Sequence, residues 1–368
     1  MRILHVSSAS RFGGGERHLQ DVTCGLEAKG HEVHIAVRPG NEWLGRMDHI
    51  IPERILTLPL RGSVDIYSAV RLSRYIRKNK IDIVHAHLAR DYPASSIAVR
   101  IARRAKLVVT RHVLFPMSSI HRLLLGNVSR AIAVSAAVES NLRRIFPNEK
   151  VVCIPHGIDP GAWDPIEREV AANSFRADHG IPPDAFLIGT VGELNQLKGQ
   201  EEFVIAANEI RGRHPNARFL CVGKDNSVDG TFKRKLRRLV KVFELEEQFV
   251  FLDWIEDTFP MLAALDVFVS ASHTESFGLA ILEAMAAGDA IVSTRTPGAE
   301  QLLEHERTGL LVGINDPVEL GEAVSILYSD EDLRSRIGSE ARKTALEKYS
   351  SRRMIDDLDG VYQSVIQT

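Results

Sequence analysis

Two glutamates eight positions apart, Glu275 and Glu283, stand in a segment that also supplies groups able to bind an anion. A pattern typical of a helix begins at Leu279, so the backbone N–H groups near Phe277, Gly278 and Leu279 point out of the helix start and favour a phosphate. A carboxylate beside an anion is favourable when it accepts hydrogen bonds from hydroxyl groups of the same ligand. The segment therefore predicts a site for a sugar joined to a phosphate.

The elements around these glutamates predict where the site lies. The apolar run 263–269 indicates a buried strand before the site, and 290–293 starts another strand after the helix 279–287. In α/β proteins, ligands bind at the carboxyl ends of parallel strands, facing helix N-termini. Glu275 is therefore expected on the loop that enters the helix, and Glu283 inside the helix.

The first residues of the chain have the pattern of a strand, a helix and a second strand. Residues 2–7 are apolar, a helix is expected from the glycine run 13–15 to about Lys29, and 31–37 form the next strand. This order predicts a parallel, doubly wound sheet. The glycines allow the backbone to approach a ligand at the helix start, but a tight turn without a ligand is an equal alternative. The run lacks the third glycine of the dinucleotide fingerprint.

Histidines end two further strands of this half. The strand 105–110 leads into Arg111 and His112, which are expected to point toward a ligand crevice. We interpret His112 as functional, with a hydrogen-bonded structural histidine as the alternative, and Arg111 as a possible partner of an anionic acceptor. His85 and His87 at the end of the strand 81–87 are interpreted as structural.

Taken with Lys198-Gly199, Gly298-x-Glu300 and Thr308-Gly309, which occur in order along the chain, the two glutamates resemble the motifs of a known family. The sequence is similar to retaining glycosyltransferases of the GT-B fold, family 4, also described as glycosyl transferases group 1. This resemblance implies an α/β protein with two Rossmann-like, doubly wound parallel-sheet domains facing a cleft, and a C-terminal helix that crosses back to the N-terminal domain. The segment 155–159 resembles the family's interdomain boundary. The expected domains are an acceptor-binding domain, 1–160 with a helix at about 350–368, and a nucleotide-sugar-binding domain, 161–349.

The resemblance also implies a role for each motif. Catalysis is expected from Glu275, His112 and Lys198. The donor is expected to contact Gly14, Lys198, Phe277, Gly278, Leu279 and Glu283, with Glu283 accepting hydrogen bonds from the ribose. The acceptor side is expected to include Gly14, Gly15, Arg111 and His112. Glu193 stands where the family has an arginine beside the donor diphosphate, which places an anion where a cation is expected.

The partners implied are a UDP- or GDP-sugar donor and a glycan or lipid-linked acceptor, with neither cofactor nor metal. The implied reaction is hexosyl transfer in lipopolysaccharide, polysaccharide or glycolipid biosynthesis. Two alternatives stay open: a nucleotide-sugar epimerase of the same fold, and a non-catalytic protein that binds nucleotide-sugars.

Composition restricts the other classes of partner. Residues 1–160 hold 24 of the 46 Lys and Arg but only 13 of the 48 Asp and Glu. This excess of positive charge indicates either a solvated basic surface or contact with an anionic membrane or a phosphate-bearing acceptor. The amphipathic, basic segment 113–130 is a candidate for shallow membrane contact, with core packing as the alternative. Nucleic acid is not expected, because aromatic residues make up only 6% of the chain.

The expected location is the cytoplasm, with possible peripheral contact at the inner face of the membrane. The apolar runs are too short to span a bilayer, and the chain begins directly with a strand pattern rather than a signal peptide. Cys24, Cys153 and Cys221 match no disulfide or metal spacing, and we expect three buried thiols.

Overall fold

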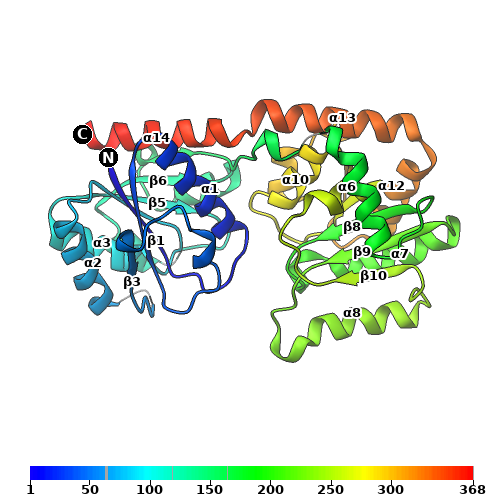
Figure 1. Cartoon of the computed structure of the whole chain (residues 1–368), viewed down its shortest axis with the longest axis horizontal. Coiled ribbons are helices and arrows are strands. Elements are labelled where there is room, and N and C mark those ends of the chain that lie inside the picture. The colour runs from blue at the N-terminus through cyan, green and yellow to red at the C-terminus, as the bar shows by residue number, and fades with distance from the viewer. Residues whose placement is uncertain (63–64, 118, 164, 368) are drawn as a thin grey trace. The chain divides into compact units, whose positions relative to one another are not determined.

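A computed structural model describes residues 1–62, 65–117, 119–163 and 165–367. The chain forms two compact units (Figure 1). Unit 1 comprises Met1–Gly157 with Ser351–Thr368, and unit 2 comprises Ile158–Ser350. The boundaries expected from the sequence are at 160 and 350.

Unit 1 is built on a seven-stranded parallel sheet of order β3-β2-β1-β4-β5-β6-β7. Its strands are β1 (Arg2–Ser7), β2 (Glu32–Val37), β3 (Ile55–Thr57), β4 (Ile83–Ala86), β5 (Lys106–Arg111), β6 (Val128–Ala133) and β7 (Val151–Cys153). Its helices are α1 (Gly14–Ala28), α2 (Ile66–Lys78), α3 (Tyr92–Ala102), α4 (Ser119–Leu124), α5 (Ala136–Leu142) and α14 (Ser351–Gln367). The central strands are buried and almost continuously apolar, as expected for a parallel sheet covered on both faces.

The last helix, α14, belongs to the core of unit 1. Met354, Ile355, Leu358 and Tyr362 share a buried cluster with Leu19 and other residues of α1 and the sheet. The two helices approach closely at Gly25, where an added Cβ would lie 2.6 Å from Cδ1 of Ile355. The predicted return of the C-terminal helix to the N-terminal half is confirmed.

Unit 2 is built on a six-stranded parallel sheet of order β10-β9-β8-β11-β12-β13. Its strands are β8 (Phe186–Val191), β9 (Ala217–Val222), β10 (Phe249–Leu252), β11 (Val267–Ser270), β12 (Ala290–Thr294) and β13 (Leu310–Val312). Its helices are α6 (Pro165–Asp178), α7 (Gln200–Arg213), α8 (Thr231–Val242), α9 (Phe259–Ala264), α10 (Leu279–Ala287), α11 (Pro297–Leu302), α12 (Pro317–Ser329) and α13 (Glu331–Lys348). The predicted fold class, two doubly wound parallel-sheet units, is therefore confirmed.

Two local predictions are wrong. The strand expected from residue 263 begins only at Val267, because Ala263 and Ala264 end helix α9. Cys24 is exposed rather than buried, since it lies on the outward face of α1, whereas Cys153 is half-buried and Cys221 is buried. Within the described ranges, none of the helices combines the length and the apolar character that crossing a membrane requires.

Candidate active site

The sheet order of unit 2 identifies the position where a ligand would bind. The chain runs from β8 outward to β10, then returns to β11 beside β8 and continues outward in the opposite direction to β13. The loops after β8 and β11 therefore separate at their carboxyl ends, which is the switch point where open α/β sheets bind ligands. Lys198 lies on the loop after β8, and Glu275 lies on the loop after β11.

These two predicted residues contact each other. Nζ of Lys198 forms an ion pair with Oε1 of Glu275, and the Oγ of Ser272 donates to the same carboxylate oxygen at 3.1 Å. The Glu275 side chain is 15% exposed and that of Lys198 33%, so both remain accessible to a ligand. The sequence motifs imply separate roles for the two side chains and do not indicate that they pair.

Close backbone packing fixes the two loops. The amide of His273 donates to the carbonyl of Leu197 at 2.9 Å, which joins one loop to the other. Gly199 has φ +66°, and an added Cβ would lie 1.9 Å from the carbonyl oxygen of Ala271. Only glycine fits here, which explains why Lys198 is followed by glycine.

Helix α10 starts beside Glu275. Gly278 precedes the helix with φ +93° and Leu279 is its first residue, so the backbone N–H groups of the first turn have no partner within the helix. Phe277 is 2% exposed and anchors the loop. Gly298 donates its amide to the Glu275 carbonyl at 3.0 Å. An ammonium group, a carboxylate and a helix N-terminus thus meet at the switch point of unit 2.

Glu283 lies inside α10, as predicted, and is 7% exposed. Its Oε2 accepts a hydrogen bond from the Oγ1 of Thr258 at 3.1 Å. Thr258 lies between β10 and α9, so this carboxylate connects α10 to the segment that follows the edge strand.

Glu193 and Lys198 have different partners in the structure. Its exposed carboxylate accepts a hydrogen bond from Nδ2 of Asn226 at 3.0 Å, while Lys198 pairs with Glu275. Glu193 and Asn226 line a pocket of about 440 Å³ with the start of α8. The anion that replaces the expected cation is therefore held by the loop after β9.

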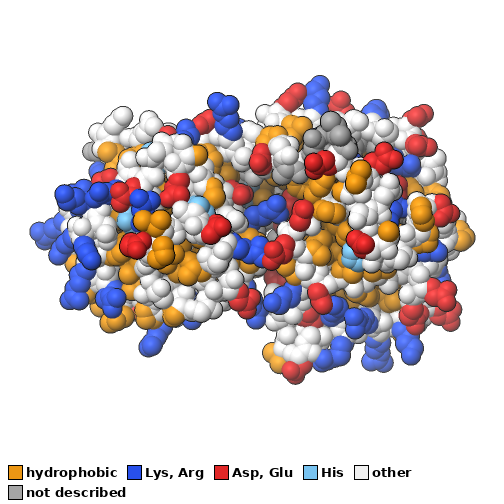
Figure 2. Space-filling model, in the orientation of Figure 1, with side chains coloured by type: hydrophobic (Ala, Val, Ile, Leu, Met, Phe, Trp, Pro, Cys, Tyr) orange, Lys and Arg blue, Asp and Glu red, His pale blue; other side chains and the backbone are white. Residues whose placement is uncertain are grey.

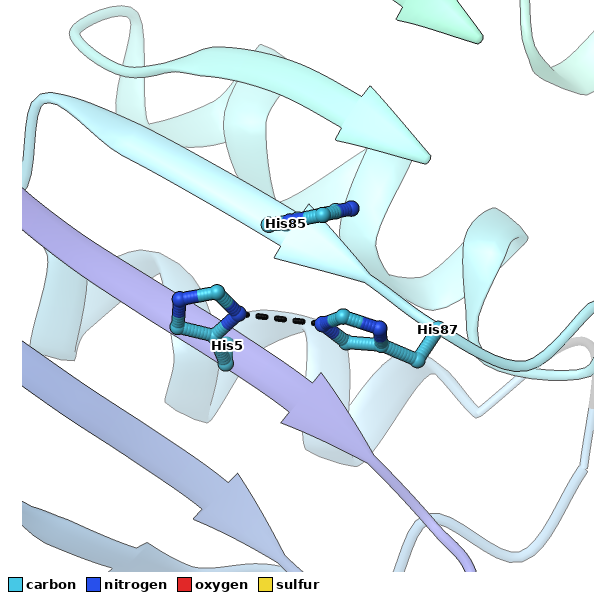
Figure 3. A group of neighbouring side chains, drawn as sticks. All are labelled: His5, His85 and His87. Atoms are coloured by element: carbon cyan, nitrogen blue, oxygen red, sulfur yellow. Dashed lines mark hydrogen bonds between the residues drawn. The ribbon is translucent and has the colours of Figure 1, made fainter. Parts of the chain in front are cut away.

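Unit 1 contains a cluster of buried histidines at the carboxyl edge of its sheet. His5 and His85 lie side by side because β1 and β4 pair in register at these positions, and His87 follows on the same face. Figure 3 shows His5 and His87 joined through Nδ1 and Nε2, which are 3.0 Å apart. His85 contacts the hydroxyl of Tyr362 at 2.6 Å and that of Thr110 at 2.7 Å.

Three more histidines extend this cluster. His18 and His156 are joined through their Nδ1 atoms at 2.9 Å. The ring of His112 is stacked on that of His156, with centroids 5.5 Å apart, and is edge-on to His18 at 5.1 Å. We call these six residues the histidine cluster: His5, His18, His85, His87, His112 and His156.

Burial keeps the histidine cluster uncharged. Desolvation lowers the pKa of His5 to about 3 and that of His112 to about 4. The pKa values of His18, His85, His87 and His156 lie well below the usual range, through burial first and neighbouring imidazoles second. A bond between two neutral imidazoles uses one N–H and one lone pair. Because Nε2 of His5 and Nδ1 of His87 have no partner among the described residues, one buried N–H stays unpaired whichever ring donates.

The other predicted residues of unit 1 lie near this edge. Gly14 and Gly15 lie in the first turn of α1, and a Cβ added at Gly15 would face open space. Arg111 ends β5 and is 6% exposed, and its guanidinium donates to the carbonyl of Phe115. Burial and this bond give Arg111 a structural role, and its further role toward an acceptor stays a prediction.

Sequence reasoning missed two carboxyl groups near the glycine loop. Burial raises the pKa of Glu16, in the first turn of α1, to about 7, although the positive charge of Arg90 lowers it. Burial also raises the pKa of Asp91 to about 6, although this carboxylate accepts the amide of Ser8 at 2.8 Å. Glu16 directly follows the glycine run, and this position was the one signal that the sequence offered.

The histidine cluster contains two groups whose nitrogens lie close enough to share a metal ion: His5 with His85 and His87, and His18 with His87 and His112. Three neutral imidazoles are a ligand set that zinc accepts. In this structure, however, His85 uses both nitrogens for hydroxyl partners, and one nitrogen each of His18 and His87 is bonded to another imidazole. These bonds form a network of neutral imidazoles, and the expectation of no metal stays a prediction.

Two family models match this chain. Residues 12–162 match the model described as Glycosyltransferase Family 4, and residues 172–344 match Glycosyl transferases group 1. The two matches fall on the two units and together span most of the chain.

Several named relatives align with nearly the full length of this chain. N-acetyl-alpha-D-glucosaminyl L-malate synthase from Bacillus anthracis is 24% identical over 93% of this chain and 91% of the relative. D-inositol 3-phosphate glycosyltransferase from Pseudarthrobacter chlorophenolicus is 27% identical over 98% and 94%. The lipopolysaccharide core biosynthesis glycosyltransferase LpsD from Rhizobium meliloti is 24% identical over 97% and 96%.

Solved structures share the fold. A glycosyltransferase from Rickettsia africae superposes with a TM-score of 0.89 at 21% identity, covering 100% of this chain and 99% of that one. The Anabaena protein HepE, solved with UDP and glucose, superposes with a TM-score of 0.86 at 22% identity, covering 99% and 100%.

Proposed function

Because the chain belongs to the group 1, or family 4, glycosyltransferases, we propose that it moves a sugar from a nucleoside-diphosphate sugar to a hydroxyl group of an acceptor, with retention of anomeric configuration. The observation that carries this proposal is the pairing of Lys198 with Glu275 at the switch point of unit 2, beside the start of α10. Such a site combines groups for a pyrophosphate with a group for sugar hydroxyls.

Lys198 supplies the positive charge that binds the donor pyrophosphate. Before the donor binds, the ion pair holds both side chains in place. The pyrophosphate then competes for the ammonium group, and the first-turn N–H groups at Gly278 and Leu279 donate to its oxygens. Glu275 is left to accept hydrogen bonds from the sugar. Glu283 accepts hydrogen bonds from the ribose hydroxyls, for which a carboxylate offers two oxygens.

The nucleoside is uridine or guanosine in this proposal. HepE, which shares the fold, has been solved with UDP and with UDP-glucose, which supports a uridine donor. The charge that develops on the leaving diphosphate is stabilised by Lys198 and the helix N-terminus, and we assign no metal or cofactor.

The acceptor is assigned to unit 1, at Gly14, Gly15, Arg111 and His112. The named relatives include enzymes of lipopolysaccharide core and capsular polysaccharide biosynthesis, which supports a glycan or lipid-linked acceptor. The neutral His112 can accept a hydrogen bond from the reacting hydroxyl or donate one to the sugar.

The reaction needs no nucleophile from the protein. The bond between the anomeric carbon and the phosphate oxygen breaks, and the acceptor oxygen bonds to the same face of that carbon. The acceptor proton passes to a phosphate oxygen of the departing nucleoside diphosphate. Glu275 holds the sugar so that its anomeric carbon faces the acceptor, a positioning effect that lowers the entropic barrier.

An assay of products tests the proposal. The protein is incubated with UDP- and GDP-sugars, with and without a panel of glycan and lipid-linked acceptors. We expect nucleotide release that requires an acceptor, and a product whose anomeric configuration by NMR equals that of the donor. Conversion of the donor sugar without an acceptor would identify an epimerase. Binding of the nucleotide-sugar without turnover would identify a non-catalytic protein. Either result contradicts the proposal.

A further inference from the structure

Helix α8 of unit 2 carries an unusual concentration of positive charge. Its twelve residues, Thr231–Val242, include six Lys and Arg and no Asp or Glu. Beyond residue 160 the chain holds 22 basic residues against 35 acidic ones. More than a quarter of the cations of this acidic region therefore lie on one short helix.

Packing of the helix directs these cations to solvent. Leu236 and Val240 are buried in the core of unit 2, and Phe232 and Leu239 pack against it. The opposite face presents exposed side chains at positions that neighbour one another on a helix: Arg234, Arg237, Arg238 and Lys241. Figure 2, seen from the same side as Figure 1, shows Lys and Arg gathered over this helix.

The protein does not neutralise this face itself. Lys233 and Lys235, at the flanks, pair with Asp253 and Glu201 at 2.6 Å each. Arg237, Arg238 and Lys241 have no ion pair within the part of the chain that the structure describes. Like charges three and four positions apart repel, which destabilises the helix. A partner with negative charge would remove this repulsion.

We propose that α8 is a docking surface for an anionic lipid bilayer. Two exposed valines flank the helix: Val228 before it, 81% exposed, and Val242 at its end, 66% exposed. Apolar side chains beside cations are typical of segments that lie on a bilayer surface, because the apolar groups enter the boundary between headgroups and acyl chains. The two aromatic residues near the ends, Phe232 and Phe243, pack against the core and leave none to stack on bases, which disfavours single-stranded nucleic acid. This surface is distinct from the segment 113–130 of unit 1.

The test measures binding of the whole protein to lipid vesicles by co-sedimentation. The variant replaces Arg237, Arg238 and Lys241 by Gln, and the matched control replaces three exposed cations of α13, namely Arg336, Lys343 and Lys348, by Gln. Each cation near an anionic surface is worth about a fivefold change in partitioning, so the α8 variant should bind vesicles containing phosphatidylglycerol about 100-fold more weakly at low salt. The control should bind like the unmodified protein, and high salt should release both.

Three results would overturn the proposal. One is equal binding to vesicles of phosphatidylcholine alone, which would show that charge is not recognised. Another is unchanged binding of the α8 variant, which would place the contact elsewhere, for example at 113–130. The third is tight binding of a DNA oligonucleotide through α8 with no binding to vesicles.

Discussion

Replacement of Glu275 by Gln is expected to slow glycosyl transfer by about 100- to 1,000-fold without unfolding the protein. The carboxylate accepts hydrogen bonds through both oxygens, whereas the amide keeps only one acceptor and presents N–H groups to the sugar hydroxyls. The change also removes the charge that pairs with Lys198. In the proposed mechanism both effects misplace the anomeric carbon relative to the acceptor.

The measurement compares kcat of the Glu275→Gln variant with that of a matched Glu322→Gln variant. Glu322 is exposed on helix α12 and lies outside the motifs, so its loss tests the effect of removing one negative charge from unit 2. Far-ultraviolet circular dichroism and thermal melting check that both variants are folded. Full transfer activity in Glu275→Gln would refute the role of this carboxylate.

Unit 1 is expected to lose stability steeply as the pH falls from about 6.5 to about 5. An exposed imidazole in the unfolded chain has a pKa near 6.5, whereas burial lowers the pKa of His5 to about 3 and of His112 to about 4 in the folded protein. Below pH 6.5 the unfolded chain therefore binds more protons, and folding becomes less favourable as the pH falls. Each such histidine contributes up to about 1.4 kcal/mol per pH unit.

Two carboxyl groups of unit 1 act in the opposite direction. Because burial raises the pKa of Glu16 to about 7 and of Asp91 to about 6, the folded chain holds these protons at pH values where the unfolded chain has released them. Their contribution grows more favourable as the pH falls to their unfolded values. Because six histidines outweigh two carboxyls, the net effect is a loss of stability of several kcal/mol by about pH 5, a large part of the 5–15 kcal/mol typical of a whole domain.

Hydrogen exchange measured by mass spectrometry at about pH 7.5 and about pH 5, corrected for the intrinsic exchange rates, resolves the two units. Peptides from β1, β4 and α14 should lose protection at the lower pH, whereas peptides from β8 and β11 of unit 2 serve as the internal control. Equal protection of unit 1 at both pH values would show that the histidine cluster tolerates protonation.

The parallel sheets could be predicted from the sequence because their strands are short apolar runs separated by helices. Gly278 and Gly288 mark the two ends of α10, since both adopt positive φ values that other residues avoid. The same reasoning failed at 263–269, where α9 and β11 follow each other without a polar break. An apolar run of this kind fits a buried helix turn and a buried strand equally well, and the tertiary packing decides between them.

The histidine cluster could not be predicted because it is assembled from distant segments. His5, His18 and His85 come from β1, α1 and β4, and His156 from the segment after β7, and only the packing of these segments brings them together. The spacing of His85 and His87 places both on one face of a strand, but it does not identify their neighbours. The ion pair between Lys198 and Glu275 was missed for the same reason, since 77 positions separate the two residues.

Isothermal titration with nucleotides tests the central claim, that the Lys198 ammonium group and the start of α10 bind the donor pyrophosphate. The titration compares UDP with UMP, and GDP with GMP, for the unmodified protein and for a Lys198→Met variant. A charge-assisted hydrogen bond is worth about 1.5–3 kcal/mol, so the unmodified protein should bind one of the diphosphates at least about 10-fold more tightly than its monophosphate, and the variant should lose this preference. An undiminished preference in Lys198→Met, or no binding of any nucleotide by the unmodified protein, would contradict the claim.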